Sequence, residues 1–342
     1  TNYGKFIAGE LFGRWNDSST ALPFLRQPSG VEDGFEQAEK ASFFSKKVDW
    51  ILGHQARFVQ TDKVNAVGGV NAHTRSALAM QFDFEAGFNL GKFLFIMQPG
   101  IRGADHRGDN TQHELDLNFR TIYAAVRDVN YFIRVGKFIP EYGIRHPNHN
   151  IPTRRDLFFN HGQEPKAVQA SYYWRTVDLN VGYLEGDNAT KGTQNIFKGK
   201  TGKFGSLVYR TAHTRTGVAH LEAEQDGVQK MSGTSVYSAI GYKEHGYTLL
   251  EYAMKRTDTI TNGTSTIENK NLAFVETGWE VTKGLMPYGT FQQIDIEKGS
   301  LRNYYALGAR FFPITHFEFN FEAGPFRTVD NKNKEIEKGT FA

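Results

Sequence analysis

The chain lacks cysteine altogether, and its 342 residues hold no stretch of about eighteen consecutive apolar residues. Without such a stretch, the sequence offers no candidate for a transmembrane helix. The absence of thiols suits the oxidising compartment of a cell envelope, although cytosolic chains can also lack cysteine. A strong charge of either sign is missing too, because the formal net charge is +3 and the pI is about 8.8. So mild an excess of basic residues does not predict a nucleic-acid partner.

Aromatic residues and glycine are abundant instead, with 28 Phe, 15 Tyr and 35 Gly. Aromatic side chains favour strands and the interfacial girdles of membrane barrels, whereas glycine serves turns and crowded strand positions. The mean hydropathy of −0.50 resembles that of a soluble protein. Strands that alternate apolar and polar residues nevertheless span a membrane without any apolar run.

Strict alternation of apolar and polar residues is clearest in the stretch LDLNFRTIYAAV, at 115–126. This period of two predicts a β-strand with one apolar and one polar face. The predicted apolar face holds Leu115, Leu117, Phe119, Thr121 and Tyr123. The predicted polar face holds Glu114, Asp116, Asn118 and Arg120. The same pattern recurs at 78–88 and at 317–323, where phenylalanines at 317, 319 and 321 alternate with polar residues.

Comparable segments recur along nearly the whole chain and predict about sixteen strands, without a convincing long amphipathic helix. The expected strands are 46–60, 74–88, 92–102, 113–125, 130–139, 167–175, 177–185, 203–212, 217–226, 234–243, 246–257, 271–281, 285–296, 302–312, 316–328 and a partial one at 336–342. An even number of strands is typical of bacterial outer-membrane barrels.

The links between these strands alternate in length. Short links lie at 89–92, 127–130, 176, 213–217, 244–246, 282–284 and 313–315, and longer ones at 61–73, 103–112, 140–166, 186–202, 227–233, 258–270, 297–301 and 329–335. In an antiparallel meander, alternate links lie at the same end of the sheet, so short turns and long loops are segregated. The fold class that this predicts is all-β: an antiparallel transmembrane β-barrel with short periplasmic turns and long extracellular loops. The apolar face of 115–123 is then expected to contact lipid.

Residues 1–342 are expected to form a single outer-membrane barrel domain, within which two segments stand out. Residues 5–15 look like a further strand, and 16–45 is interpreted as a plug or a periplasmic segment. Residues 140–166 form a long basic loop punctuated by proline. This loop either folds into the pore and constricts it or stays outside as a surface loop.

The alternate residues of each strand that are polar are expected to line the barrel interior. Charges of both signs there would steer ions through a water-filled pore, or would simply pair with one another as any barrel interior requires. The residues proposed for solute contact or pore lining are Arg120, Arg134, Arg154, Arg155, Asp116, Glu114, Arg310 and Glu318.

Catalytic and metal-binding motifs find little support. The sequence has no G-x-S-x-G, H-E-x-x-H or P-loop pattern, so no catalytic residue, no cofactor and no enzyme activity is predicted. His146 and His149 are three residues apart, but Pro147 excludes a helical ligand pair. With no cysteine available either, no metal site is predicted.

The stretch IRVGKFIPEYGIRHPNHNIPTRRDLFF, at 133–159, resembles Gram-negative porin-like barrels. A strand that ends in Gly136-Lys137-Phe138, then Tyr142-Gly143, then a long basic loop is similar to the phosphate-selective porins of the O/P type. The resemblance covers less than a tenth of the chain. It implies passive diffusion, often through trimers, with basic residues at the constriction. The many carboxylates among the candidate pore residues depart from a lysine-rich anion pore.

Three functions are compared on this basis. The first is an outer-membrane porin-like channel for passive diffusion of small hydrophilic solutes or ions, and this is the function the sequence favours. The second is a plugged structural or interaction barrel docked to a lipoprotein or envelope complex. A barrel enzyme is the third. The expected location is the bacterial outer membrane, and the expected partners are the lipid bilayer, lipopolysaccharide, and a homo-trimer or a lipoprotein.

Overall fold

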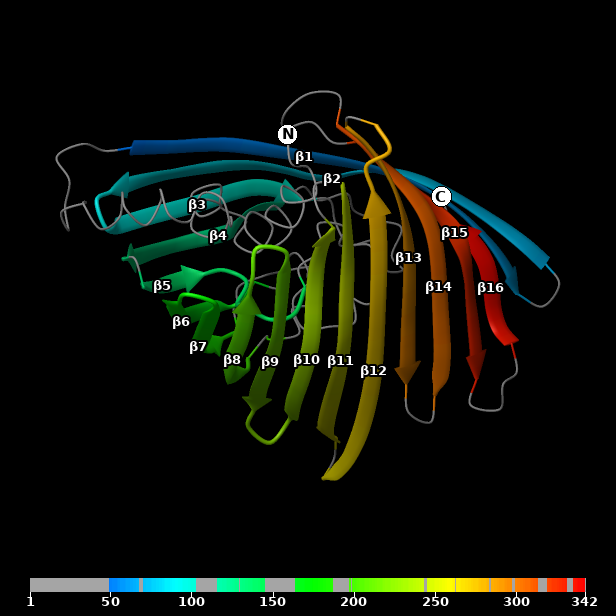
Figure 1. Cartoon of the computed structure of the whole chain (residues 1–342). Helices are drawn as coiled ribbons and strands as arrows, with labels where there is room; N and C mark the ends of the chain where they lie inside the picture. Colours follow the sequence, from blue (N-terminus) through cyan, green and yellow to red (C-terminus); the bar gives the residue numbers. More distant parts are fainter. Residues whose placement is uncertain are drawn as a thin grey trace.

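The computed structural model describes residues 49–67, 70–102, 116–128, 130–144, 164–186, 197, 199–242, 245–261, 263–282, 284–296, 299–312, 319–330 and 335–341. These residues form sixteen antiparallel β-strands that pair in sequence order. The last strand, β16, pairs with the first, β1, so the sheet closes into a barrel (Figure 1). Within the described ranges, no helix is long and apolar enough to cross a membrane.

The strands differ widely in length around the barrel. The first eight are β1 (Asp49–Val67), β2 (Val70–Leu90), β3 (Phe93–Arg102), β4 (Asp116–Arg127), β5 (Tyr131–Lys137), β6 (Lys166–Trp174), β7 (Val177–Glu185) and β8 (Thr201–Arg210). The second eight are β9 (Thr214–Gln225), β10 (Gln229–Tyr242), β11 (Gly246–Thr261), β12 (Thr264–Trp279), β13 (Leu285–Ile296), β14 (Ser300–Phe311), β15 (Phe319–Asp330) and β16 (Glu335–Phe341). The wall is therefore short at β5–β8 and long at β1, β2, β11 and β12 (Figure 1).

Alternating burial confirms the period of two that the sequence predicts. In β6, Ala167, Gln169, Ser171 and Tyr173 are buried, while the residues between them are exposed. Successive side chains of a strand point to opposite faces, so the buried set faces the barrel interior and the exposed set faces outward. The predicted bounds of β7 and β13, 177–185 and 285–296, agree with the structure at both ends.

Exposed apolar side chains cover much of the outer face. They include an aromatic residue close to the short-turn end of several strands, namely Trp174, Tyr209, Tyr242, Trp279, Phe311 and Phe319. Above these lie aliphatic and aromatic residues such as Leu179, Val236 and Leu307. An apolar band bordered by an aromatic girdle is what a transmembrane barrel presents to lipid.

A β-bulge in β4 overturns part of the predicted alternation. Gln98 of β3 pairs with Thr121, but the next residue, Pro99, pairs with Phe119, so Arg120 is an extra residue in β4. Phe119 is 43% exposed, whereas Thr121 and Tyr123 are each only 1% exposed. The prediction that the whole apolar set of 115–123 faces lipid is therefore wrong beyond Phe119. A bulge inserts one unpaired residue and so exchanges the two faces of the strand.

Several of the predicted long links are in fact strand. Residues 61–67 and 70–73 extend the β1–β2 hairpin, which leaves only 68–69 between the strands. Likewise, 258–261 and 264–270 lengthen β11 and β12, and Gly263 has the positive φ of a tight turn. The strand ends that are joined by the connections that remain long, at 103–115, 138–165 and 186–200, all lie at one end of the barrel. The segments 5–15 and 16–45 lie outside the described residues.

Candidate functional site

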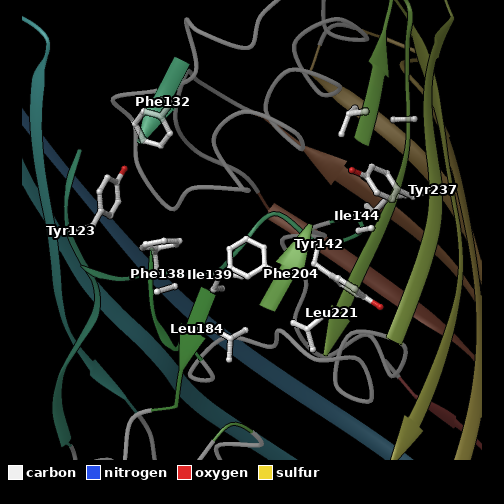
Figure 2. Packing of buried hydrophobic residues seen from close by; sticks show 14 of the residues in the cluster. Tyr123, Phe132, Phe138, Ile139, Tyr142, Ile144, Leu184, Phe204, Leu221 and Tyr237 are labelled. Carbon is white, nitrogen blue, oxygen red and sulfur yellow. The ribbon is translucent and has the colours of Figure 1, made fainter. Parts of the chain in front are cut away.

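The segment Phe138–Ile144 follows β5 and lies inside the barrel. All of its residues are buried, and Phe138, Ile139, Tyr142 and Ile144 belong to one cluster of buried apolar residues. Figure 2 shows them between Tyr123 of β4 on one side and Leu221 and Tyr237 of β9 and β10 on the other. The first part of the long loop therefore crosses the interior instead of leaving the barrel at the end of β5.

Polar contacts fix this segment to the opposite wall. Glu141 Oε2 lies 3.7 Å from Arg215 Nη2 of β9, and both side chains are largely buried. At Gly143, whose φ is +62°, a Cβ atom would lie only 2.1 Å from Glu251 Oε1 of β11. Ser235 donates a 2.6 Å hydrogen bond to the same oxygen. At Gly143 the loop lies so close to the wall that any other side chain would have to displace Glu251, and the positive φ also favours glycine.

Tyr142 of this segment is uncharged at any physiological pH. Burial raises the pKa of its hydroxyl far above the usual value, and the nearby Glu251 carboxylate raises it further. Both causes disfavour the phenolate. Tyr142 therefore serves the interior as a large ring with a neutral polar tip, and not as a charge.

Arg134 of β5 is held within the wall by aromatic rings and amides. Its guanidinium carbon lies 3.9 Å from the ring centre of Phe138 and 5.6 Å from that of Tyr123, which is cation–π geometry. Its Nη2 donates to Gln169 Oε1 at 2.9 Å and to the carbonyl of Ile139 at 3.3 Å. The side chain is 0% exposed. Arg134 therefore links β5 and β6 to the start of the interior segment.

A ladder of neutral polar side chains continues around the interior from Gln169. The Nε2 atom of Gln169 donates to Ser171 Oγ at 2.9 Å and lies 3.5 Å from Asn180 Oδ1 of β7. Asn180 Nδ2 in turn donates to Ser206 Oγ of β8 at 3.0 Å. Gln169 is satisfied by Ser171 of its own strand and by Asn180 of β7, and Asn180 by Ser206 of β8, as buried polar groups require.

A second charged network surrounds Arg310 of β14. Its Nη2 donates to Glu276 Oε1 of β12 at 2.8 Å, and its Nη1 donates to Tyr247 Oη of β11 at 2.7 Å. Tyr247 Oη donates to the same Glu276 oxygen at 2.6 Å. Thr290 adds a 3.3 Å hydrogen bond to Glu276 Oε2. Four neighbouring strands, β11 to β14, thus contribute side chains to the network around one buried ion pair.

Tyr288 connects this network to β15. Its ring centre lies 4.8 Å from the guanidinium carbon of Arg310, and its hydroxyl is 2.7 Å from Asn320 Oδ1 and 2.8 Å from Glu322 Oε2. Phe319 and Phe321 point outward and are exposed. The alternation predicted for 317–323 is therefore confirmed for the described residues.

The predicted pore residues have different outcomes. Arg134 and Arg310 face the interior, but each lies in its own network. Asp116 and Arg120 belong to β4, with Arg120 at the bulge, and their side chains lie outside the description. Glu114, Arg154, Arg155 and Glu318 lie outside the described residues.

Sequence reasoning missed several interior residues. Glu141, Arg215, Glu251 and Glu276 carry the charges that the structure brings together, and none of them was singled out. The parity of β12 places Glu276 inward, but its inward neighbours Leu272 and Phe274 are apolar. Polarity alone therefore did not mark that face as the interior.

Among the described residues, no group of three or more His, Cys, Asp or Glu side chains is placed to hold a metal ion. The interior of the described barrel instead offers ion pairs, hydroxyls, amides and aromatic rings. Such groups can contact a hydrated ion or a small polar solute without a fixed cofactor.

Comparison with known proteins gives matches among solved structures. No family model and no curated protein matches the chain. The outer membrane channel DcaP of Acinetobacter baumannii is 12% identical and superposes with a TM-score of 0.62, over 88% of this chain and 97% of that one. An anion-selective porin from Comamonas acidovorans is 10% identical, with a TM-score of 0.58 over 86% and 98% of the two chains.

OmpT of Vibrio cholerae, in a trimer form, is also 10% identical, with a TM-score of 0.53 over 86% of this chain and 96% of that one. At such low identity the likeness concerns the fold. It agrees with the closed sheet and the apolar outer band already described. The chain has the fold of the outer-membrane porins, a closed antiparallel β-barrel with an apolar outer band.

Proposed function

We propose that the protein is an outer-membrane channel through which small hydrophilic solutes or ions diffuse passively. The observation that carries the proposal is a closed barrel with an apolar outer band, whose interior holds charged networks and one inserted segment, Phe138–Ile144. A barrel of about sixteen strands is wide enough for an aqueous passage. A segment that crosses this passage narrows it and brings solutes close to the wall.

The architecture favours a channel over an enzyme. The polar groups of the described interior are tied into pairs and ladders across neighbouring strands, as with Arg310 and Glu276. A catalytic site needs a nucleophile or base aimed at a substrate position. The charged groups named above pair across the described wall, as Arg310 does with Glu276, and this suits a passage with fixed local charges.

Planar lipid bilayers test the proposal. The refolded barrel should give stepwise conductance increases in potassium chloride, and a salt gradient should give a reversal potential that reports its ion preference. Folding is checked separately by migration on a denaturing gel before and after boiling, because closed barrels have no free edges and resist detergent. A barrel that shows the heat-dependent shift but never conducts would contradict the proposal.

A plugged structural barrel is the second candidate, and the apolar cluster around Phe138 and Tyr142 favours it because such a cluster fills interior space. Deletion of 16–45 tests the case in which that segment completes the plug. A plug predicts conductance that emerges only after the deletion, whereas an open channel conducts with the segment present.

If the protein is a channel, its proposed solute-contact residues and partners are the following. Arg154 and Arg155 of the long loop, with Arg120, Asp116, Glu114 and Glu318, are proposed to face the solute, while Arg134 and Arg310 set the local field from within the wall. The trimer form of OmpT supports a homo-trimer. Lipopolysaccharide is the proposed lipid neighbour.

A further inference from the structure

The inner face of β14 and β15 carries an arginine whose guanidinium is not engaged by the described wall. Arg302 of β14 is the register partner of Ile294 in β13 and of Thr328 in β15, which are 1% and 4% exposed. Opposite residues of an antiparallel pair share a face, so Arg302 faces the interior. Within the described part of the chain, Arg302 takes part in no ion pair and no hydrogen bond, and its Nε atom is buried.

The other arginines described above have partners in the wall. Arg310 is bound by the Glu276 carboxylate, and Arg134 by amide and carbonyl oxygens. A guanidinium has five N–H donors and cannot lose its charge in a protein. Such a group is stable in a partly buried position only when an acceptor meets it. At Arg302 that acceptor has to come from outside the described wall.

Thr328 presents a second unused donor directly beside this arginine. Its hydroxyl oxygen is buried and has no hydrogen-bond partner among the described residues. The Cβ atoms of Thr328 and Arg302 are about 4.5–5.5 Å apart, as in any directly opposite pair. An oxyanion placed over the pair would accept N–H groups from the arginine and the O–H group of the threonine. Binding would thus satisfy two buried donors whose loneliness costs free energy.

An aromatic pair adjoins the two donors on the same face. Tyr304 and Phe326 are the next inward register pair of β14 and β15, about 6.6 Å along the strands. Their ring centres lie 6.0 Å apart and their planes are inclined by only 21°. Phe326 is buried, whereas Tyr304 is partly exposed. A flat apolar body can pack against Tyr304 while its charged end reaches Arg302.

One carboxylate limits the charge of the ligand. Asp330 is the register partner of Ser300 and so lies diagonal to Arg302 on the same face. It interacts with a different group, and no ion pair joins it to Arg302 within the described ranges. A ligand with a second negative charge would be repelled by Asp330, because like charges at an interface disfavour binding.

We propose that Arg302 and Thr328, with Tyr304 beside them, bind small organic monocarboxylates that have a planar apolar body. Arg302 meets the carboxylate with two parallel N–H donors, and Thr328 donates a third hydrogen bond. The site lies near the end of β14 and β15 that leads into 297–299 and 331–334, which is the end of the long connections. This inference rests on the proposed function and deepens it, because it names a class of solute.

Benzoate is the probe, and acetate, phthalate and inorganic phosphate are the comparisons. Binding to the refolded barrel in detergent is measured by isothermal titration calorimetry, so that the measurement does not depend on conduction. Benzoate should bind at least tenfold more tightly than acetate, which lacks the planar body. The same margin is expected over phthalate, which carries a second carboxylate, and over phosphate.

Four variants assign the binding to these side chains. Arg302→Gln should weaken benzoate binding at least tenfold, and Thr328→Val at least threefold. Arg302→Lys keeps the charge but loses the planar fork, so it should recover only part of the affinity. Arg327→Gln is the matched control, because Arg327 adjoins Thr328 but faces outward and is exposed, and it should change the affinity less than twofold.

Folding and conduction are measured separately on the same preparations. Thr328→Val removes a hydroxyl without a described partner, so the temperature of its heat-dependent gel shift should not fall. No saturable benzoate binding by the folded barrel, undiminished binding by Arg302→Gln, or phosphate binding as tight as that of benzoate would each overturn the inference. A barrel that binds benzoate but never conducts contradicts the channel and supports the site, and a conducting barrel that does not bind benzoate contradicts the site alone.

Discussion

Arg310 shows how a charge is kept inside the wall. Its guanidinium meets a carboxylate, a tyrosine hydroxyl and the face of a second ring, so that Glu276, Tyr247 and Tyr288 all hold it. The carboxylate of Glu276 is itself fully buried. A buried ion pair of this kind contributes only modestly to the free energy of unfolding. Loss of one partner, however, leaves the other as an uncompensated buried charge.

Glu276→Leu should therefore destabilise the barrel strongly. With Arg310 left without its carboxylate, the free energy of unfolding should fall by about 3 kcal/mol. Urea unfolding of the refolded barrel in detergent micelles measures the change. Glu268→Gln is the matched control, because its 2.7 Å pair with Lys270 is partly exposed and should cost less than about 1 kcal/mol.

The double variant Glu276→Leu with Arg310→Met checks the cause. Removing both charges leaves no uncompensated ion, so most of the loss should be recovered. A double variant as unstable as the single one would show that packing, and not charge, dominates at this position.

The insertion of Phe138–Ile144 into the barrel is decided by its sequence. The segment combines large apolar side chains with one acidic residue, Glu141, and one glycine at its closest approach to β11. Apolar residues at the start of a loop gain most when they are removed from water. A surface loop would leave them exposed, so the interior position is the one consistent with this composition.

Gly143→Ala should loosen this segment. The new methyl group would overlap Glu251 Oε1, and a left-handed conformation costs an L-residue about 1–2 kcal/mol. The segment should withdraw from β11, so that single-channel conductance rises while the heat-dependent gel shift persists. Gly227→Ala is the control, because its φ is +66° but no atom lies within 4 Å of the added carbon. Equal conductance changes in both variants would assign the effect to backbone strain alone.

Strand existence followed from the sequence, but strand ends did not. The alternation predicted a segment that overlaps each of the sixteen strands, because a half-buried strand requires alternating apolar and polar residues. Hairpins such as β11–β12 continue past the apolar band into polar residues like Thr257–Thr261. Once both faces are polar, alternation no longer distinguishes a strand from a loop, and 258–270 was predicted to be a link.

At the scale of the whole molecule, closure depends on the seam between β1 and β16. Only Lys63, Val64 and Asn65 of β1 have register partners in β16, whereas β1 and β2 are paired along their whole lengths. The sequence indicated an even strand number but not how the ends meet, because pairing between distant segments leaves no local pattern. The interior networks were equally unpredictable, since they join residues from three or four strands.

Val64→Cys with Thr340→Cys should lock this seam. The two residues are register partners, and opposite residues in an antiparallel pair have Cβ atoms about 4.5–5.5 Å apart. A disulfide there closes a very long loop and should stabilise the barrel by about 4 kcal/mol. The oxidised variant should need a higher temperature for its gel shift, and reduction should abolish the gain. Each single variant is the control, and an unchanged transition would place the weakest point elsewhere.

Because Arg120 is an extra residue, β4 should tolerate its deletion. Phe119 lies on the outer face and Thr121 on the inner one, although they are two positions apart. Excision of Arg120 would join them as ordinary neighbours, with every other side chain of the strand left on its own side. Removing one residue anywhere else in β4 would turn part of the strand inside out. Deletion of the codon for Arg120 should therefore disturb the barrel less than deletion of a neighbouring codon.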